Sequence, residues 1–393
     1  MRKIKVAFFA EILTEDLDGA VRTMYQIINR IDAVNFDFLF IYGNGPSKIA
    51  GFKGLRIPSI RLPFNKNYTV ALPCLARTRL NDSLQAFSPD VVHIATPSLL
   101  GYFGLSYAVK NSLPVITIYH THFISYVDYY LKYAPFLIKK AKQAIAKNHS
   151  GFYNQCDMVY VPSESIKAEL GSIGVLPVKM KIWKRGIDTS LFSPDKRNLK
   201  LMQQLTGNKN PVILFASRLV WEKNLETLFG IYDELQASQT AVNFLIVGDG
   251  SARKACEARM QNAVFTGKAD HSYLSVLYAS ADIFLFPSVS ETYGNVVLEA
   301  MASGLPCIIA DGGGSKDFIQ QGFNGFKCEP YNVADYIEKI KLTLSNKVLY
   351  KQFSAEGLIC SRQLNWEQLA RVYFEDIGHL AELLMENHPV ASV

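Results

Sequence analysis

ADIFLFPSVSETYGNVVLEAMASGLPCIIADGGGSKDFIQQGFNG, residues 281–325, is the stretch that decides the fold. It predicts a short apolar strand over Ile283–Phe286, a polar loop, and a helix that starts near Asn295. The helix stops at the glycine two residues before Pro306, because glycine suits the left-handed residue after a helix and proline cannot continue one. A second strand follows over Cys307–Ala310, before three consecutive glycines and another helix start. The alternation is typical of an α/β sheet.

Two carboxylates flank the junction between the first loop and its helix. Glu291 lies in the loop, and Glu299 lies about one turn into the predicted helix. Between them, Tyr293, Gly294 and Asn295 present backbone N–H groups at a helix N-terminus, which is partly positive and can hold a phosphate. Gly294 has no Cβ and lets a ligand approach the backbone closely. Carboxylates repel phosphate and suit sugar hydroxyls, so the stretch predicts a site for a nucleoside diphosphate joined to a hydroxyl-rich group.

The block resembles a known family. The spacing Glu-x7-Glu from Glu291 to Glu299, followed by EAMASGLP and GGG, is similar to the nucleotide-sugar site of the retaining glycosyltransferases of family 4. The resemblance implies the α/β GT-B fold, in which two Rossmann-like domains face each other across a cleft. It also implies that Glu299 holds the ribose and Glu291 the hydroxyls of the donor sugar. It extends over nearly the whole chain and is best from Pro211 to Pro330.

Length and composition describe a globular chain with a large core. Its 393 residues suggest two or three domains, since single cores seldom grow past about 250–300 residues. The net charge of +6 suits anionic partners of any kind. The six cysteines are scattered, which favours buried thiols in a reducing compartment over a disulfide frame or a zinc site. We expect no signal peptide and no membrane span, because no apolar run approaches about 20 residues.

A basic pair follows the strand predicted over Pro211–Ala216. Arg218 and Lys223 lie five residues apart, between the strand end and the next helix start. Both can reach a diphosphate there, Arg218 as a planar fork and Lys223 as a point charge. A solvated basic turn is the alternative for either residue alone. With Glu291 and Glu299 predicted in the same half of the chain, we favour the phosphate role.

Two further segments of this half are candidates for donor contacts. The strand Phe244–Gly248 ends in Gly248-Asp249-Gly250, where a close turn beside a ligand is expected. Lys268 ends the segment VFTGK, which resembles the family segment whose backbone contacts the nucleotide base.

The N-terminal half alternates apolar strands with helices, which predicts a doubly wound sheet. The first loop, Glu11–Gly19, has no GxGxxG motif, and this argues against a dinucleotide-dependent dehydrogenase. Gly19, at the next helix start, resembles one glycine of the family's Gly-rich first loop. Asp16 and Asp18 have a spacing that can hold a divalent metal, although a helix start is the favoured reading.

A histidine pair follows the strand Val115–Ile118. Loops at the carboxyl ends of parallel strands are where such sheets bind ligands. His120 is the closer match to the family's acceptor-side histidine, and His122 is the alternative.

The sequence predicts a domain division in the middle of the chain. The N-terminal, acceptor-side domain is expected over 1–190 and the C-terminal, donor-side domain over 195–366. A last helix, about 367–393, is expected to return to the first domain. The polar stretch Pro194–Asn210 is interpreted as a hinge.

The predicted function is transfer of a sugar, with retention, from a UDP- or GDP-sugar to a glycan or lipid acceptor hydroxyl. Arg218 and Lys223 would stabilise the leaving diphosphate, and His120 would position the sugar. No cofactor and no metal ion are expected. The alternatives are another GT-B enzyme, such as a nucleotide-sugar epimerase or a phosphorylase, and a non-catalytic nucleotide-sugar-binding protein.

Basic residues point to an anionic membrane surface as a partner. From Phe38 to Asn81 there is no acidic residue, while seven are basic. The segment 129–147, YYLKYAPFLIKKAKQAIAK, interleaves lysines with aromatic and apolar residues, a pattern of helices that lie on anionic bilayers. Ordinary solvated faces are the alternative. Nucleic acid is disfavoured, since no binding motif accompanies the charge. We expect a cytoplasmic protein, peripheral on the inner face of the plasma membrane.

Overall fold

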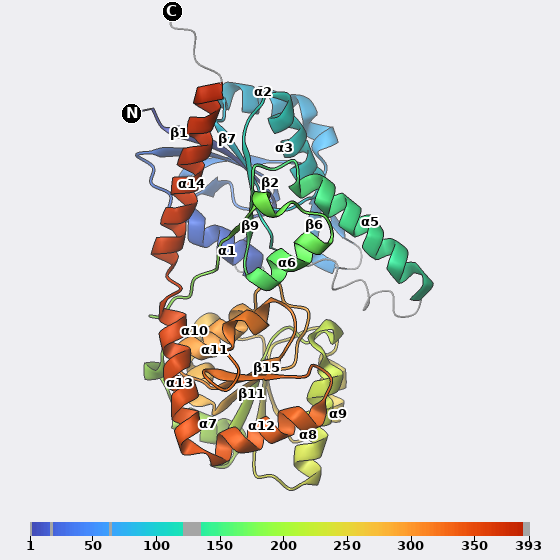
Figure 1. Ribbon diagram of the computed structural model, residues 1–393, viewed down its shortest axis with the longest axis vertical. Coiled ribbons are helices and arrows are strands. Elements are labelled where there is room, and N and C mark those ends of the chain that lie inside the picture. The colour runs from blue at the N-terminus through green and yellow to red at the C-terminus, as the bar shows by residue number, and fades with distance from the viewer. Residues whose placement is uncertain (1, 16–18, 63–64, 121–134, 388–393) are drawn as a thin grey trace, which may run out of the picture. The chain divides into compact units, whose positions relative to one another are not determined.

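Parallel β-sheets form the centre of both halves of the computed structural model (Figure 1). The structure describes residues 2–15, 19–62, 65–120 and 135–387. These divide into two compact units. Unit 1 comprises the described residues up to 120, Phe136–Lys184, and the chain from Trp366 on, while unit 2 comprises Arg185–Asn365.

An eight-stranded sheet forms unit 1, with the strand order β10-β9-β8-β7-β1-β2-β4-β3. Every neighbouring pair is parallel except β3–β4. A separate antiparallel hairpin, β5–β6, follows β4. The strands are β1 (Ile4–Ile12), β2 (Phe36–Asn44), β3 (Lys48–Ile49), β4 (Phe52–Arg56), β5 (Ser59–Leu62), β6 (Asn65–Ala71), β7 (Val91–Ile94), β8 (Val115–Ile118), β9 (Met158–Val161) and β10 (Met180–Ile182).

Both faces of this sheet are buried, because successive side chains of a strand point to opposite faces. In β1, Ala7 and Phe9 pack into one apolar cluster, while Val6 and Phe8 pack into another. The helices are α1 (Gly19–Ile28), α2 (Arg77–Phe87), α3 (Leu99–Lys110), α5 (Pro135–Tyr153), α6 (Glu164–Ser172) and α14 (Trp366–Asn387), with the short helices η1 (Pro73–Ala76) and η2 (Pro177–Lys179).

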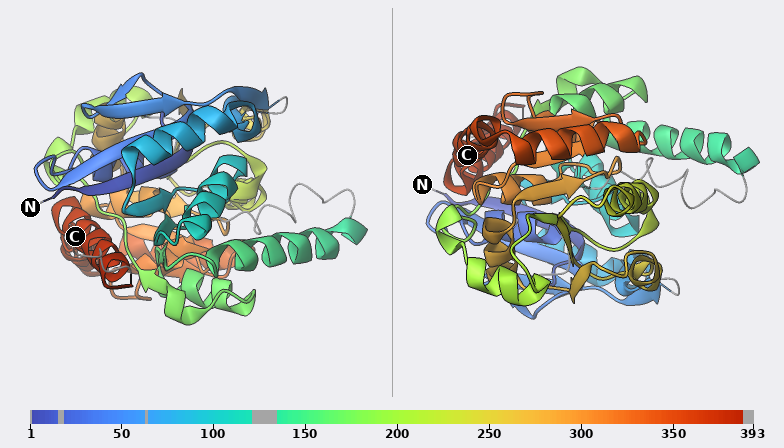
Figure 2. Two further views of the ribbon diagram at one scale, coloured as in Figure 1. Left: turned by 90° about the horizontal axis from the view of Figure 1, so that it is seen from above. Right: turned by 90° about the horizontal axis from the view of Figure 1, so that it is seen from below.

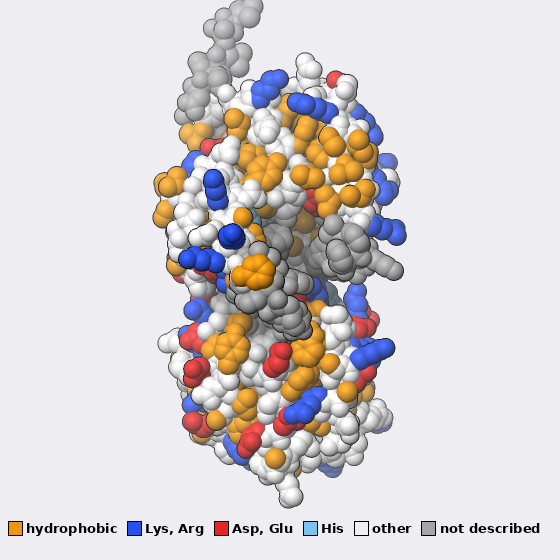
Figure 3. All heavy atoms as spheres, turned by 90° about the vertical axis from the view of Figure 1, so that its right-hand side faces the viewer, with side chains coloured by type: hydrophobic (Ala, Val, Ile, Leu, Met, Phe, Trp, Pro, Cys, Tyr) orange, Lys and Arg blue, Asp and Glu red, His pale blue; other side chains and the backbone are white. Residues whose placement is uncertain are grey.

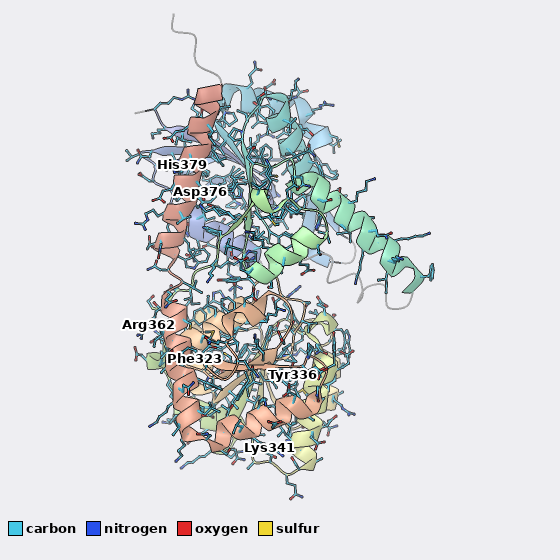
Figure 4. The ribbon with its side chains drawn as sticks, viewed as in Figure 1. Phe323, Tyr336, Lys341, Arg362, Asp376 and His379 are labelled. Carbon is cyan, nitrogen blue, oxygen red and sulfur yellow. The ribbon has the colours of Figure 1, made fainter. Side chains whose placement is uncertain are left out.

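The C-terminal helix α14 completes the core of unit 1 (Figures 1 and 2). Tyr373, fully buried, shares a hydrogen bond of 2.8 Å with Nδ1 of His93 on β7. Asp376, labelled in Figure 4, accepts hydrogen bonds from the Tyr160 hydroxyl and, at 2.7 Å, from the Lys181 ammonium. These polar contacts fix how α14 lies on the sheet.

A six-stranded parallel sheet forms unit 2, with the order β13-β12-β11-β14-β15-β16. Helices lie on both sides of it in Figure 1. The strands are β11 (Val212–Ala216), β12 (Asn243–Val247), β13 (Val264–Gly267), β14 (Ile283–Phe286), β15 (Cys307–Ala310) and β16 (Gly325–Cys328). The helices are α7 (Leu199–Thr206), α8 (Leu225–Ala237), α9 (Arg253–Arg259), α10 (His271–Ser280), α11 (Asn295–Ala302), α12 (Val333–Ser345) and α13 (Lys347–Arg362), with η3 (Pro194–Lys196), η4 (Trp221–Lys223) and η5 (Gly314–Phe318).

The predicted α/β fold with Rossmann-like parallel sheets is confirmed, with local differences. The stretch 194–210, interpreted as a hinge, contains η3 and α7, and Met202 of α7 packs into the core of unit 2. Strand β1 continues to Ile12, so Glu11 lies in a strand and not in the first loop.

His93 makes the stability of unit 1 depend on pH. Its ring stacks on Phe8 with 4.0 Å between centroids, and burial lowers its pKa to about 3. Below about pH 6.5 the unfolded chain binds a proton at this imidazole that the folded chain does not bind until near pH 3. The free energy of unfolding should therefore fall as pH falls through this window, by up to about 1.4 kcal/mol per pH unit.

Urea unfolding of the wild type and of His93→Gln between pH 7 and 5, above the range where most carboxylates titrate, measures this effect. The variant should unfold more easily but show a flatter dependence on pH. His379→Gln, at the exposed histidine labelled in Figure 4, is the control and should keep the wild-type slope. An unchanged slope in His93→Gln would contradict the assignment.

Candidate functional site

The loops that carry most of the predicted site residues meet at the centre of the sheet of unit 2. Strands β11 and β14 are neighbours, and the chain continues outward from them in opposite directions, to β12 and to β15. Such a switch point leaves a crevice at the carboxyl ends of the strands, where doubly wound sheets bind ligands. The loop after β11 contains Arg218 and Lys223, and the loop after β14 contains Glu291 and Gly294.

Asn224 ties these loops together. It has φ = 56°, a left-handed conformation that asparagine tolerates better than most residues. Its side-chain amide donates to the backbone oxygen of Pro287 at 3.1 Å and to that of Pro330 at 2.9 Å. The Ser290 hydroxyl adds a bond of 2.7 Å to the backbone oxygen of Glu222. The loops after β11, β14 and β16 are therefore fastened to one another before any ligand binds.

An ion pair joins the predicted basic pair to the predicted carboxylates. The Lys223 ammonium contacts Oε1 of Glu291, and the lysine side chain is only 5% exposed. Arg218 differs, because its side chain is 56% exposed and its Nη2 lies 3.9 Å from Oε1 of Glu222. Lys223 thus supplies a nearly dry positive charge at the switch point, whereas Arg218 extends from the rim into solvent.

Gly294 brings the start of helix α11 close to the glycine run. It has φ = 84°, and a Cβ there would lie 2.5 Å from Cβ of Ser315. The backbone N–H of Gly314 donates to the backbone oxygen of Glu291 at 2.6 Å. Helix α11 has no side-chain cap and no acidic residue in its first turn, and Oδ1 of Asn295 is buried without a hydrogen-bond partner among the described residues. These polar groups suit a ligand that carries both charge and hydrogen-bond donors.

The Tyr293 side chain has a structural role, which leaves its backbone for a ligand. Its hydroxyl donates to the backbone oxygen of Arg185 at 2.9 Å, and its ring packs edge-on against Phe318. Burial raises the pKa of the phenol, and the bond to Arg185 opposes this only partly. Tyr293 therefore stays neutral and is no acid or base at ordinary pH.

Packing requires two glycines, Gly248 and Gly250, in the turn after β12. A Cβ on Gly248 would lie 1.9 Å from the backbone oxygen of Ser217, and a Cβ on Gly250 would lie 2.3 Å from that of Leu219. Both glycines let the turn after β12 press against the loop that carries Arg218. Lys268, just after β13, is exposed at the same edge of the sheet. Glu299 lies within α11 and is 7% exposed.

Gly19 and His120 belong to unit 1. Gly19 is the first residue of α1, and His120 follows β8 with 6% exposure. Both lie at the carboxyl edge of their sheet. The alternatives Asp16, Asp18 and His122 lie outside the described residues.

Sequence reasoning missed a second group of polar residues at this edge of unit 1. Strands β1 and β7 form its switch point. Glu11 is the next-to-last residue of β1, and Thr96 follows β7. Oε2 of Glu11 accepts a bond of 2.7 Å from the backbone N–H of Ala71. Within the described ranges, Oε1 of Glu11 and the hydroxyls of Thr96 and Thr69 are buried without a hydrogen-bond partner. Their positions at strand ends were the available signal.

Two family models match the chain. The model described as Glycosyltransferase Family 4 matches residues 17–191, and the model described as Glycosyl transferases group 1 matches residues 197–358. A GDP-mannose-dependent alpha-mannosyltransferase of Mycobacterium tuberculosis is 31% identical over 323 residues, which cover 80% of this chain and 81% of that protein. The chain belongs to glycosyltransferase family 4. This confirms the family that the Glu-x7-Glu block indicated.

Other family relatives are longer than this chain. The sulfoquinovosyl transferase of Arabidopsis thaliana is 31% identical over 310 residues, and the alpha-monoglucosyldiacylglycerol synthase of Streptococcus pneumoniae is 28% identical over 265 residues. The matches cover 77% and 65% of this chain, and 58% of each relative. Among solved structures, Anabaena HepE in complex with UDP has a TM-score of 0.75 at 17% identity and covers 96% of this chain and 100% of its own. That likeness confirms the GT-B fold.

No metal cluster is evident in the part of the chain that the structure describes, where no three or more His, Cys, Asp or Glu side chains are grouped to hold an ion. Nor does any helix in that part have the length and apolar character needed to cross a bilayer.

The pair Lys223–Glu291 should contribute to the stability of unit 2. Lys223→Met leaves the Glu291 charge without its partner in a mostly buried loop, and we expect a loss of about 3 kcal/mol in unfolding free energy. Glu291→Gln combined with Lys223→Met should recover most of that loss. Chemical denaturation of the single and double variants measures the coupling between the two residues.

The matched control is Arg259→Met, which breaks the exposed pair with Asp233 on unit 2. Exposed pairs contribute about 0–1 kcal/mol, so this variant should be nearly neutral. If Lys223→Met were equally mild, the pair would not be the nearly dry contact described here.

Proposed function

We propose that the chain is a retaining glycosyltransferase that moves a sugar from a UDP- or GDP-sugar to an acceptor hydroxyl. The observation that carries the proposal is the Lys223–Glu291 pair at the β11/β14 switch point, beside the uncapped start of α11. One crevice thereby offers positive charge and backbone donors for a diphosphate, and a carboxylate for sugar hydroxyls. Relatives that are named GDP-mannose-dependent alpha-mannosyltransferases support the proposal.

Each residue has a proposed task. Lys223 and Arg218 stabilise the negative charge that develops on the leaving diphosphate, and preorganised charge of this kind is the largest catalytic contribution in many enzymes. A diphosphate beside Lys223 weakens the pull of the lysine on Glu291. That carboxylate then becomes available to the hydroxyls of the donor sugar.

The remaining donor contacts follow from position. Glu299 accepts the ribose hydroxyls, and the backbone at Tyr293, Gly294 and Asn295 holds phosphate. Gly248 lets the loops close around the donor, and Lys268 lies beside the base.

On the acceptor side, His120 positions the transferred sugar and Gly19 allows close approach of the backbone. Glu11 and Thr96, with buried oxygens that lack partners among the described residues, receive hydroxyls of the acceptor. We propose no cofactor and no metal ion in the reaction.

The direct test is a screen of UDP- and GDP-sugars by thermal shift, followed by assay of nucleoside diphosphate release with and without acceptors, in buffer and in EDTA. Release should require an acceptor, proceed equally in EDTA, and give a product with the anomeric configuration of the donor by proton NMR. An inverted product would contradict retention. Epimerised donor formed without acceptor would favour the epimerase alternative, and tight donor binding without any turnover would favour a binding protein.

The same assay tests the basic pair. Arg218→Ala should lower kcat/KM by about 100-fold or more, because removing one stabilising donor typically costs that much. Arg259→Ala, which breaks the exposed pair between α9 and Asp233 of the same unit, is the control. Equal rates in both variants would exclude a role of Arg218 at the diphosphate.

For the acceptor, we propose a lipid or lipid-linked glycan reached by peripheral binding at the cytoplasmic face of the membrane. Helix α5 supports this: Phe136 is 77% exposed beside exposed Lys139 and Lys140, and the helix extends beyond the other helices of unit 1 (Figures 1 and 2). On the face turned to the viewer in Figure 3, unit 1 shows more basic than acidic side chains, whereas unit 2 mixes both. A relative whose name includes diacylglycerol is consistent with such an acceptor.

Co-sedimentation with vesicles that contain anionic lipid tests this binding. It should be clear at low salt and weaken at high salt. It should also fall when Lys139, Lys140 and Lys142 are changed to glutamate, since each basic residue near the surface contributes on the order of 1 kcal/mol. The matched control changes Lys341, Lys347 and Lys351 of unit 2 to glutamate and should bind as the wild type does. Equal loss in both variants would indicate a net-charge effect without a docking face.

A further inference from the structure

A surface pocket of unit 1 joins two arginines from separate elements. It has a volume of about 410 Å³ and is lined by Arg56, Ile57, Pro58, Ser59 and Arg79. Arg56 is the last residue of β4, Ser59 is the first of β5, and Arg79 lies in the first turn of α2. Because β4 is parallel to β1 and β2, the pocket opens at the carboxyl edge of the sheet, the edge that also carries Glu11 and His120.

These two arginines lack counterions, whereas several other arginines of the protein have them. On helix α9, Arg253 pairs with Glu257, and Arg259 with Asp233. Among the described residues, Arg56 and Arg79 make no hydrogen bond or ion pair, and the Tyr42 phenol lies near the Arg56 guanidinium.

The chain around the pocket is poor in acids that could balance this charge. No aspartate or glutamate occurs between Phe38 and Asn81, so β4, β5 and the turn between them bring none. Asp82 of α2 lies three residues after Arg79, and no ion pair joins the two side chains. Glu11 also comes near: a Cβ on Gly43 would lie 3.1 Å from the Glu11 backbone oxygen and 3.3 Å from Cβ of Ser59. Its carboxylate, however, is already bound to the backbone N–H of Ala71.

The backbone of the pocket is held in place on both sides. The N–H of Ile57 donates to the oxygen of Tyr42 at 2.8 Å, and the oxygen of Pro58 accepts from the N–H of Leu72 at 2.7 Å. Ile57 itself is 1% exposed and packs into the core. A site whose frame is already ordered loses little further entropy when a ligand binds.

We propose that this pocket binds a phosphate group, as a monoester or diester, carried by the acceptor. The inference rests on the proposed transfer to an acceptor in unit 1. Two guanidinium groups without partners, one on each side, match the charge and the planar forked geometry that phosphate oxygens accept. The Ser59 hydroxyl, which now makes only a long bond of 3.3 Å to the oxygen of Gly43, is a third donor at the same place.

The position of the pocket relates it to the acceptor hydroxyls. Through Gly43, Ser59 approaches the end of β1, where Oε1 of Glu11 is buried without a partner among the described residues. A ligand with its phosphate in the pocket therefore has a carboxylate oxygen nearby to receive a hydroxyl. A phosphate next to a polyol occurs both in phospholipid headgroups and in soluble phosphate esters, and the experiment distinguishes these two sources.

The test compares Arg56→Gln/Arg79→Gln with the control Arg61→Gln/Arg77→Gln. Both double variants lose two positive charges from the same region, and Arg61 and Arg77 lie on β5 and α2 without lining the pocket. The probe is glycerol 3-phosphate, titrated calorimetrically at fixed ionic strength. Wild type and control should bind it at one site, and the pocket variant at least about tenfold more weakly, the expected loss for charged hydrogen bonds.

A second arm uses phosphatidylcholine vesicles with and without phosphatidylglycerol. Weaker binding of the pocket variant than of the control to the anionic vesicles identifies the lipid headgroup as the source. Weaker binding to glycerol 3-phosphate, with equal vesicle binding, identifies a soluble ester. Equal binding of both probes by the two variants, or no saturable binding by the wild type, would overturn the proposal.

Two further measurements keep the test independent of folding and of the donor site. Thermal melting of each variant shows whether unit 1 remains folded. The variant Arg56→Lys/Arg79→Lys retains the two charges and should restore part of the binding. Titration with UDP and GDP should be unchanged in all variants, because the donor residues lie in unit 2. If the wild type bound neither UDP nor GDP, the proposed function would be rejected, while the titration with glycerol 3-phosphate would still test the pocket.

Discussion

The nearly dry ion pair between Lys223 and Glu291 is the contact around which unit 2 is organised. It joins the two loops that diverge from the central strands, and it does so where desolvation makes an unpaired charge expensive. Asn224, Ser290 and the glycine run surround the pair with backbone bonds, so that neither loop is free to move away. Lys223 is held in a fixed position by the carboxylate that, in the proposed function, a substrate would later share.

Much of this arrangement follows from short-range rules. Strands such as Ile283–Phe286 and Cys307–Ala310 were predicted to the residue, because short apolar runs between turn residues leave one choice. The end of helix α11 was predicted from Gly304 and Pro306. In the structure Gly304 has the expected left-handed conformation, with φ = 72°. The grouping of Arg218, Lys223 and Glu291 in one unit followed from their places in loops after strands, and that of Glu299 from its place in the helix that follows one such loop.

The features that could not be predicted from the sequence depend mostly on contacts between residues far apart in the chain. Glu11 reads as a loop residue until Ala71, 60 positions away, binds its carboxylate. The role of the Tyr293 ring depends on Arg185, 108 positions away. Helix α7 was missed because it is short and lies within a mostly polar stretch, although Leu201, Met202 and Leu205 recur at helical spacing and pack on the core of unit 2. The pairing of Arg56 with Arg79 arises only when β4 and α2 come together.

Helix α14 also constrains how the protein is made. Trp366, Tyr373, Ile377 and Leu380 belong to the same apolar cluster as Phe8 and Phe40 of the first strands, yet all of unit 2 separates them in the sequence. During synthesis on the ribosome, one face of the first sheet therefore stays uncovered until the last helix has emerged. The nascent chain must carry that exposed apolar surface through the translation of the whole intervening unit, which makes it a natural client for chaperones and delays the maturation of unit 1 until after unit 2.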